Sequence, residues 1–186
     1  MAVLRASTRF GFISCCVAFA LLLAAPARAE ESEAVKLQEN KIKAGLIYNF
    51  LKYTNWSSSA GNNLRVCLLG GDSFSGDLDP LRGRTAQQYV IDIAYQSDIA
   101  ETGACNLIFI NRNQEKNLPE LLRTLQGRNI LTVSDIDRFT ERGGMIELSK
   151  GDDRRIHLYV NRQAMAAAGI SIEDRLVKLA ELVRQP

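Results

Sequence analysis

Histidine is almost absent from this sequence, and the motifs of common enzyme classes are missing. His157 is the only histidine among 186 residues, and it lies in the alternating stretch RRIHLYV. A single strand histidine is more often structural than catalytic, and a metal site needs more ligands. No G-x-S-x-G motif is present. The aspartate pairs 135/137 and 152/153 are explained by a helix start and a hairpin turn. We therefore predict a non-enzyme without a metal or cofactor.

Phosphate-binding motifs are missing as well. The stretch RVCLLGGDSF (65–74) resembles a strand that enters a glycine-rich loop. Its glycines fit neither the dinucleotide fingerprint nor the P-loop, and no lysine follows them. Asp72 stands where a phosphate would bind and would repel it. We interpret Gly70 and Gly71 as an ordinary strand-end turn in which glycine permits a positive φ.

The first 29 residues contain no acidic side chain. Arg5 and Arg9 precede the apolar run FGFISCCVAFALLLAA, and Ala27-Arg28-Ala29 follows. A basic start, an apolar middle and a small-x-small ending predict a signal peptide over residues 1–29 and an exported chain. An uncleaved anchor helix is the alternative, but an anchor has no use for the small-residue ending.

Excess charge of one sign is absent from the remainder, residues 30–186. Removing residues 1–29 takes away three arginines and leaves 20 basic against 21 acidic residues. No basic stripe carries aromatic residues between its charges, so we expect no nucleic-acid partner. A chain of this length is typical of one domain with its own core.

Cysteine is scarce in the predicted mature chain. Cys15 and Cys16 leave with the signal peptide, so only Cys67 and Cys105 remain. Two cysteines in an exported protein usually pair, which predicts a disulfide. Two free, buried thiols are the alternative.

The longest helical pattern covers residues 34–53. A narrow polar stripe runs along it, and almost all of the remaining surface from Ile42 to Tyr53 is apolar. Such a helix is buried on several sides or lies at an interface. Core burial is the simpler interpretation. The alternative is a contact with a second copy or a partner, for which the candidates are the aromatic residues Tyr48, Phe50, Tyr53 and Trp56.

Strand and helix patterns alternate along the rest of the chain. Strands are predicted at 64–69, 89–95, 105–110 and 129–133. Helices are predicted at 117–127, at 136–142 behind a capping box of Ser134 and Asp137, and at 172–183 behind Ser171. GMIELS and RIHLYV flank the turn KGDDR as a hairpin. The order predicts a single α/β domain with a mainly parallel sheet, helices on both faces and an antiparallel edge hairpin.

Several segments, taken in order, resemble one family. They are KAGLIYNFLKYTNW, RVCLLGGDSF, ACNLIFINR, NILTVSDIDRF, GGMIEL, RIHLYVN and AGISIEDRLVKLAELV. Together they are similar to the YfiR family of small periplasmic proteins, over residues 41–183. Ser57 stands where the family usually has proline, and Asn106 where it usually has histidine. The second cysteine pair of some members is missing, so redox behaviour that depends on that pair is not carried over.

The resemblance implies a regulator. YfiR-like proteins hold the periplasmic sensor domain of an inner-membrane diguanylate cyclase inactive, and an outer-membrane lipoprotein relieves them. The expected outputs are cyclic-di-GMP signalling and biofilm regulation, and a homodimer is expected. The alternative is a ligand-sensing accessory module for another membrane receptor, such as a histidine kinase.

Overall fold

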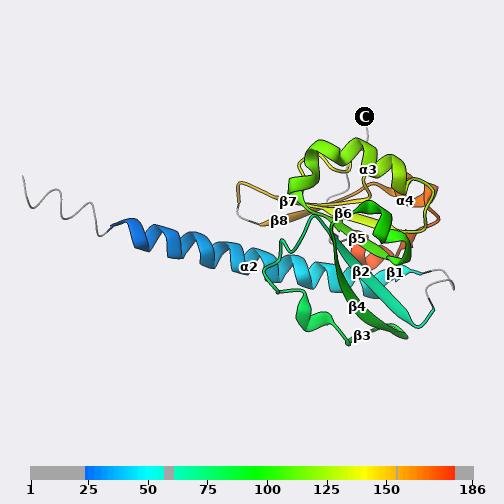
Figure 1. Cartoon of the computed structure of the whole chain (residues 1–186), viewed down its shortest axis with the longest axis horizontal. Coiled ribbons are helices and arrows are strands. Elements are labelled where there is room, and N and C mark those ends of the chain that lie inside the picture. Colours follow the sequence, from blue (N-terminus) through cyan, green and yellow to red (C-terminus); the bar gives the residue numbers. More distant parts are fainter. Residues whose placement is uncertain (1–23, 57–60, 154, 179–186) are drawn as a thin grey trace, which may run out of the picture. The chain divides into compact units, whose positions relative to one another are not determined.

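The computed structural model describes residues 24–56, 61–153 and 155–178 (Figure 1). The chain divides into two units, Met1–Gln38 and Glu39–Pro186, and the second contains all the strands that the structure describes. Most of the predicted signal peptide lies outside the described residues, so it stays a prediction. Among the described helices, none has the length and hydropathy needed to cross a membrane.

Helix α2, Ala24–Tyr53, contains the predicted helix 34–53. In the part of α2 that belongs to the second unit, Ile47, Phe50 and Leu51 are completely buried, and Lys41 and Lys52 are exposed. The predicted polar stripe is thus largely on the solvent side. The apolar face packs against the sheet, and burying one such side chain stabilises a fold by about 1.5–3 kcal/mol.

The last carbonyl groups of α2 are satisfied by side chains from elsewhere. Gln87, in a left-handed conformation (φ 54°), donates its amide to the carbonyl oxygens of Leu51, Lys52 and Thr54 at 3.2, 3.0 and 2.9 Å. Trp56 Nε1 donates to the Leu51 oxygen at 2.9 Å. Because helix ends leave carbonyl oxygens without intrahelical donors, these bonds fix where α2 stops.

Seven strands form one mixed sheet in the order β3-β4-β2-β5-β6-β7-β8. The strands are β2 Asn63–Leu69, β3 Thr85–Ala86, β4 Tyr89–Gln96, β5 Leu107–Ile110, β6 Leu131–Ser134, β7 Ile146–Lys150 and β8 Ile156–Val160. Strands β4, β2, β5, β6 and β7 pair in parallel, while β3 and β8 add antiparallel edges. The fold is therefore α/β, and the predicted hairpin forms one edge of the sheet.

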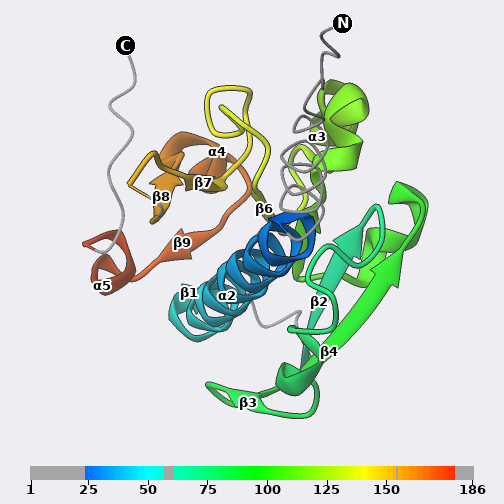
Figure 2. The same cartoon turned by 90° about the vertical axis from the view of Figure 1, so that its left-hand side faces the viewer.

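The two faces of the sheet carry separate apolar clusters. Along β2, Leu64, Val66 and Leu68 join the cluster that contains the buried residues of α2. Cys67 and Leu69 point the other way and join Leu118, Leu121 and Leu125 of α3, Leu118–Leu125. This alternation is the period of two that a strand imposes. Figure 2 shows the C-terminal part of α2 with β2 and β4 on one side and β7 and β8 on the other.

Short 3₁₀ helices occupy several connections. They are η2 Asp79–Leu81, η3 Ile99–Ala104 and η4 Arg112–Asn117. Asp98 caps η3 by accepting a hydrogen bond from the Ala100 amide at 2.8 Å.

The helix predicted at 136–142 is wrong, because these residues form turns. Ser134 Oγ accepts from the Ile136 amide at 3.0 Å and donates to the Ile110 oxygen at 2.7 Å, so it does not form the capping box with Asp137. The buried carboxylate of Glu147 accepts from the amides of Arg138 and Thr140 at 3.2 Å each. These bonds satisfy the backbone without a helix.

The helix predicted to begin after Ser171 is also wrong at its start. Helix α4, Arg162–Ala167, is followed by strand β9, Ser171–Ile172, which pairs antiparallel with β1, Thr54–Asn55. The Glu173 amide then donates to the Tyr53 oxygen at 2.9 Å. Helix α5, Asp174–Val177, begins only after these backbone groups are used. Residues 179–183 of the predicted helix lie outside the described residues.

Candidate functional site

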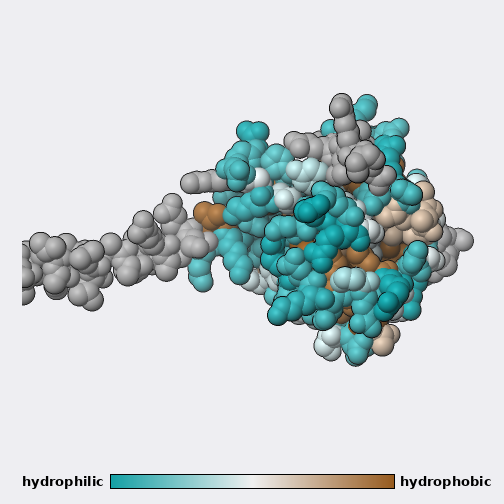
Figure 3. Space-filling model, turned by 90° about the horizontal axis from the view of Figure 1, so that it is seen from above, coloured by the Kyte–Doolittle hydropathy of each residue, from teal (hydrophilic) through white to brown (hydrophobic). Residues whose placement is uncertain are grey.

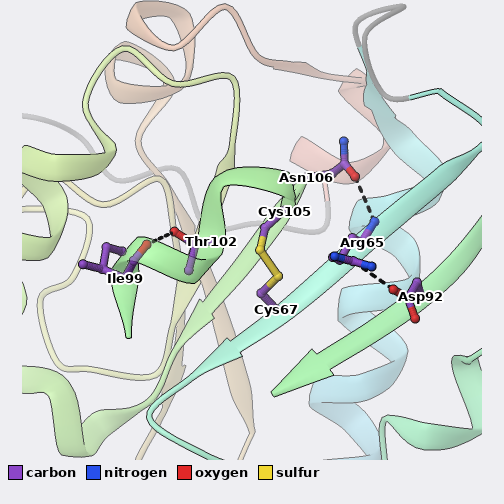
Figure 4. The surroundings of a disulfide bond; sticks show 7 residues. All are labelled: Arg65, Cys67, Asp92, Ile99, Thr102, Cys105 and Asn106. Carbon is purple, nitrogen blue, oxygen red and sulfur yellow. Dashed lines mark hydrogen bonds and ion pairs between the residues drawn. A yellow bond between two sulfur atoms is a disulfide. The ribbon is translucent and has the colours of Figure 1, made fainter. Parts of the chain in front are cut away.

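The predicted disulfide is present in the structure. Cys67 lies within β2 and Cys105 lies just before β5, with a Cα–Cα distance of 5.9 Å (Figure 4). Both residues are buried in the cluster beneath α3. Beside the bond, Asn106 Oδ1 accepts from the Arg65 amide at 2.8 Å, and Arg65 pairs with Asp92 at 2.9 Å. The bond therefore joins β2 to the segment that leads into its neighbouring strand β5.

The carboxyl ends of β2 and β5 form the place where open α/β sheets usually bind ligands. The chain runs from β2 to β4 on one side and then to β5 on the other, which makes this a topological switch point. Here Asp72 accepts from the amides of Phe74 and Gly76 at 2.8 Å each. Those are the donors that a phosphate would use. The interpretation of this glycine pair as a strand-end turn is confirmed, since Gly70 and Gly71 have φ of 96° and 94°.

The loop after β5 packs closely on the same turn. Asn113 Nδ2 donates to the Gly70 oxygen at 2.8 Å. A Cβ atom on Gly70 would lie 2.3 Å from Asn113 Oδ1. The protein's own side chains thus occupy the usual ligand position.

A buried ion network lies beyond β6. Lys43 of α2 is 5% exposed and contacts Glu39 at 2.7 Å and Asp135 at 2.8 Å. Glu39 also contacts Lys150 at 3.0 Å. Burial raises the pKa of Glu39, but the hydrogen bonds and charges of the two lysines outweigh burial and leave that pKa below its usual value. Lys43 was not predicted as part of a site, although its spacing of four from Glu39 is typical of a helical ion pair.

Asp137 and Asp153, which the sequence also singled out, have basic side chains as partners. Arg112 holds Asp137 at 3.0 and 3.2 Å, and this contact lowers the pKa of Asp137. In the hairpin, His157 Nε2 lies 3.0 Å from Asp153 Oδ1. The hydrogen bond from His157 lowers the pKa of Asp153. Within the described residues, no cluster of three or more His, Cys, Asp or Glu side chains could hold a metal ion.

The four candidate interface residues fall into two groups. Phe50 is completely buried in the core, so its assignment to an interface is corrected: its ring has no surface to offer. Tyr48, Tyr53 and Trp56 are partly buried at the margin of the same cluster. Tyr48 donates to the Thr85 oxygen at 3.2 Å and lies 4.9 Å from the Arg84 guanidinium. These three residues stay candidates, placed around the end of α2 and the β3–β4 turn.

A pocket of about 560 Å³ lies between α3 and α4. Its walls come from α3, from the turn before β7 and from α4, and its charged side chains are Arg123 and Arg142. No local sequence pattern predicts this pocket, because its walls come from segments far apart in the chain. On the face viewed in Figure 3, a few hydrophobic residues are visible between mostly hydrophilic ones.

Comparison with known proteins identifies the family. No curated protein matches the chain significantly. The family description YfiR/HmsC-like matches residues 40–181, which is most of the chain and includes every strand of the sheet. The chain therefore belongs to the YfiR/HmsC-like family.

Proposed function

We propose that this chain is a periplasmic protein that binds the sensor domain of an inner-membrane diguanylate cyclase and holds the cyclase inactive. Membership of the YfiR/HmsC-like family carries the proposal. The Cys67–Cys105 disulfide supports an oxidising compartment. The occupied switch point and the paired carboxylates agree with a binding role rather than a catalytic one.

Repression of this kind is a shift between two states of the cyclase. The chain would bind the inactive state more tightly than the active state, and only this difference in affinity moves the equilibrium. A preference of about a hundredfold corresponds to about 2.7 kcal/mol, which lies within the usual range of coupling free energies. An outer-membrane lipoprotein would relieve repression by capturing the chain.

The surface around the end of α2 is our candidate for the contact. Tyr48, Tyr53 and Trp56 lie there, and partly buried aromatic residues dominate many interfaces. Their polar atoms are partly satisfied within the chain, as in the bond from Trp56 to Leu51. They would therefore contribute mainly apolar area to a partner or to a second copy of this chain.

Two measurements test the proposal. Deleting the gene should raise cyclic-di-GMP and biofilm formation, and restoring it should reverse both effects. A tagged chain should also capture a membrane diguanylate cyclase from solubilised envelopes. Unchanged cyclic-di-GMP after deletion, with no cyclase captured, would contradict the proposal. Mass spectrometry of the periplasmic protein should give a mature N-terminus at Glu30.

The alternative function is a ligand-sensing module for another membrane receptor, such as a histidine kinase. The pocket between α3 and α4 favours it, because regulation by a small ligand needs such a site. The capture experiment separates the two functions by the receptor that it recovers.

A further inference from the structure

The pocket between α3 and α4 has the size and the lining of a small-molecule site. Its volume of about 560 Å³ falls within the range of about 300–1,000 Å³ that is usual for such sites. Leu122, Met145, Ala164 and Ala167 provide apolar walls, and small residues such as Gly143 leave the space open. A ligand with an apolar body fits this part of the pocket.

The charged residues of the lining indicate which polar group the ligand carries. Among the described residues that line the pocket, Arg123 and Arg142 are charged and none is acidic. Glu115 fixes Arg142 through its carboxylate at 3.2 Å and its carbonyl oxygen at 3.3 Å. Arg123 forms no ion pair with any residue that the structure describes. A guanidinium in this position suits a carboxylate or a phosphate, which it binds with paired N–H donors.

We propose that this pocket binds a small organic anion with an apolar body, whose carboxylate or phosphate group pairs with Arg123 and Arg142. Gln126 and Gln163 also line the pocket and supply amide donors. The site is distinct from the candidate contact surface around Tyr48, Tyr53 and Trp56. Its ligand therefore does not have to compete with a partner there.

The pocket is physically connected to that surface. Asn129 donates to the carbonyl oxygens of Ala168 and Gly169 at 3.1 Å each, which ties the end of α4 to the segment after α3. From α4 the chain continues into β9, which pairs with β1 next to Trp56. A ligand that clamps α4 against α3 would therefore steady the β1–β9 pair. The regulatory meaning of this link rests on the proposed function, whereas binding itself does not.

Binding is tested by titrating the purified full chain with hexanoate and, in a separate experiment, with hexyl phosphate. NMR or calorimetry provides the readout. Acetate removes the apolar body and hexanol removes the charge, so both should bind far more weakly. Arg123→Gln and Arg142→Gln should each weaken binding by about tenfold or more, as expected for a lost charge-assisted bond. Ala167→Leu should block the pocket, and Arg128→Gln, an exposed arginine outside the lining, should have no effect.

The outcomes are decisive in either direction. Circular dichroism must first show that each variant is folded. Three results would each overturn the site. Neither probe binds, hexanol binds as tightly as the anionic probes, or binding survives both Arg123→Gln and Ala167→Leu. The stronger of the two probes identifies the anionic group. Hydrogen exchange at Ser171 and Ile172 should slow in the bound state, and unchanged exchange would overturn the link to β9. None of these measurements involves the cyclase, so they stand apart from the test of the proposed function.

Discussion

Lys43 and Asp135 form an ion pair of 2.8 Å although 92 residues separate them, and the lysine is almost completely buried. The pair joins α2 to the loop after β6. Since charges removed from water are tolerated only when they are compensated, neither partner is replaceable by itself.

We expect Lys43→Ala to destabilise the protein by about 2–4 kcal/mol, because the carboxylates of Asp135 and Glu39 would lose this buried cation. Chemical denaturation measures the change. Lys41→Ala removes an exposed lysine two residues earlier in the same helix and should change the free energy of unfolding by less than about 0.5 kcal/mol. Equal effects of the two substitutions would contradict a special role for the buried pair.

The same network predicts a dependence of stability on pH. The pKa of Glu39 is lowered in the folded state, so its contribution is fully present above the unfolded value of about 4.3 and is lost as pH falls through the folded pKa. The difference in stability between the wild type and Glu39→Gln should therefore be largest at neutral pH and shrink below that value. Urea unfolding at a series of pH values measures it. If the difference in stability grew on acidification, the lowered pKa of Glu39 in the folded state would be refuted.

Loss of the disulfide should be costly. Replacing both Cys67 and Cys105 by alanine should lower the free energy of unfolding by about 2–5 kcal/mol. Melting curves with and without reductant provide the check, because reductant should lower the melting temperature of the wild type and leave the variant unchanged. Identical wild-type curves would show that the bond is dispensable.

Phe50 and Tyr53 should respond differently to substitution. Phe50→Ala should cost about 3–5 kcal/mol of stability, since it opens a cavity in the core. Tyr53→Glu should change stability by only about 1 kcal/mol, because the side chain is partly exposed. If the proposed surface is correct, Tyr53→Glu should also reduce capture of the cyclase.

Asn117→Glu is the matched control for that experiment. It adds the same negative charge at an exposed position at the end of η4, outside the candidate contact surface. Capture should be unchanged by Asn117→Glu and reduced by Tyr53→Glu. Equal capture by both folded variants would remove Tyr53 from the interface.

Elements with a strong local pattern were predictable from the sequence. Strands such as β4 and the helix α3 show clear periodicity, and β2 and β5 are short apolar runs that end at polar or glycine residues. The disulfide followed from cysteine usage. In each of these cases the deciding information lies within a few neighbouring residues or in the type of compartment.

Elements decided by distant partners were not predictable. Residues 136–142 follow a capping pattern, but the buried carboxylate of Glu147 satisfies their backbone as turns. In the sequence Ser171 resembles a helix cap, but in the structure it belongs to β9, which pairs with β1. Phe50 shares its helix with surface aromatics, and the direction of its side chain depends on the sheet. The wall of the pocket has no local pattern at all.

The pairing of β1 with β9 has a consequence for the order of folding. Asn55 and Ser171, whose side chains are bonded at 2.9 Å, are 116 residues apart, so almost the whole domain must be synthesised before this contact can close. Contacts with such long separations form slowly, because the loop entropy is lost before the contact stabilises the chain. A nascent chain that still lacks its last segment therefore cannot complete this structure. Late closure of this kind keeps the growing chain unfinished for longer, which would suit the export that the signal-peptide prediction implies.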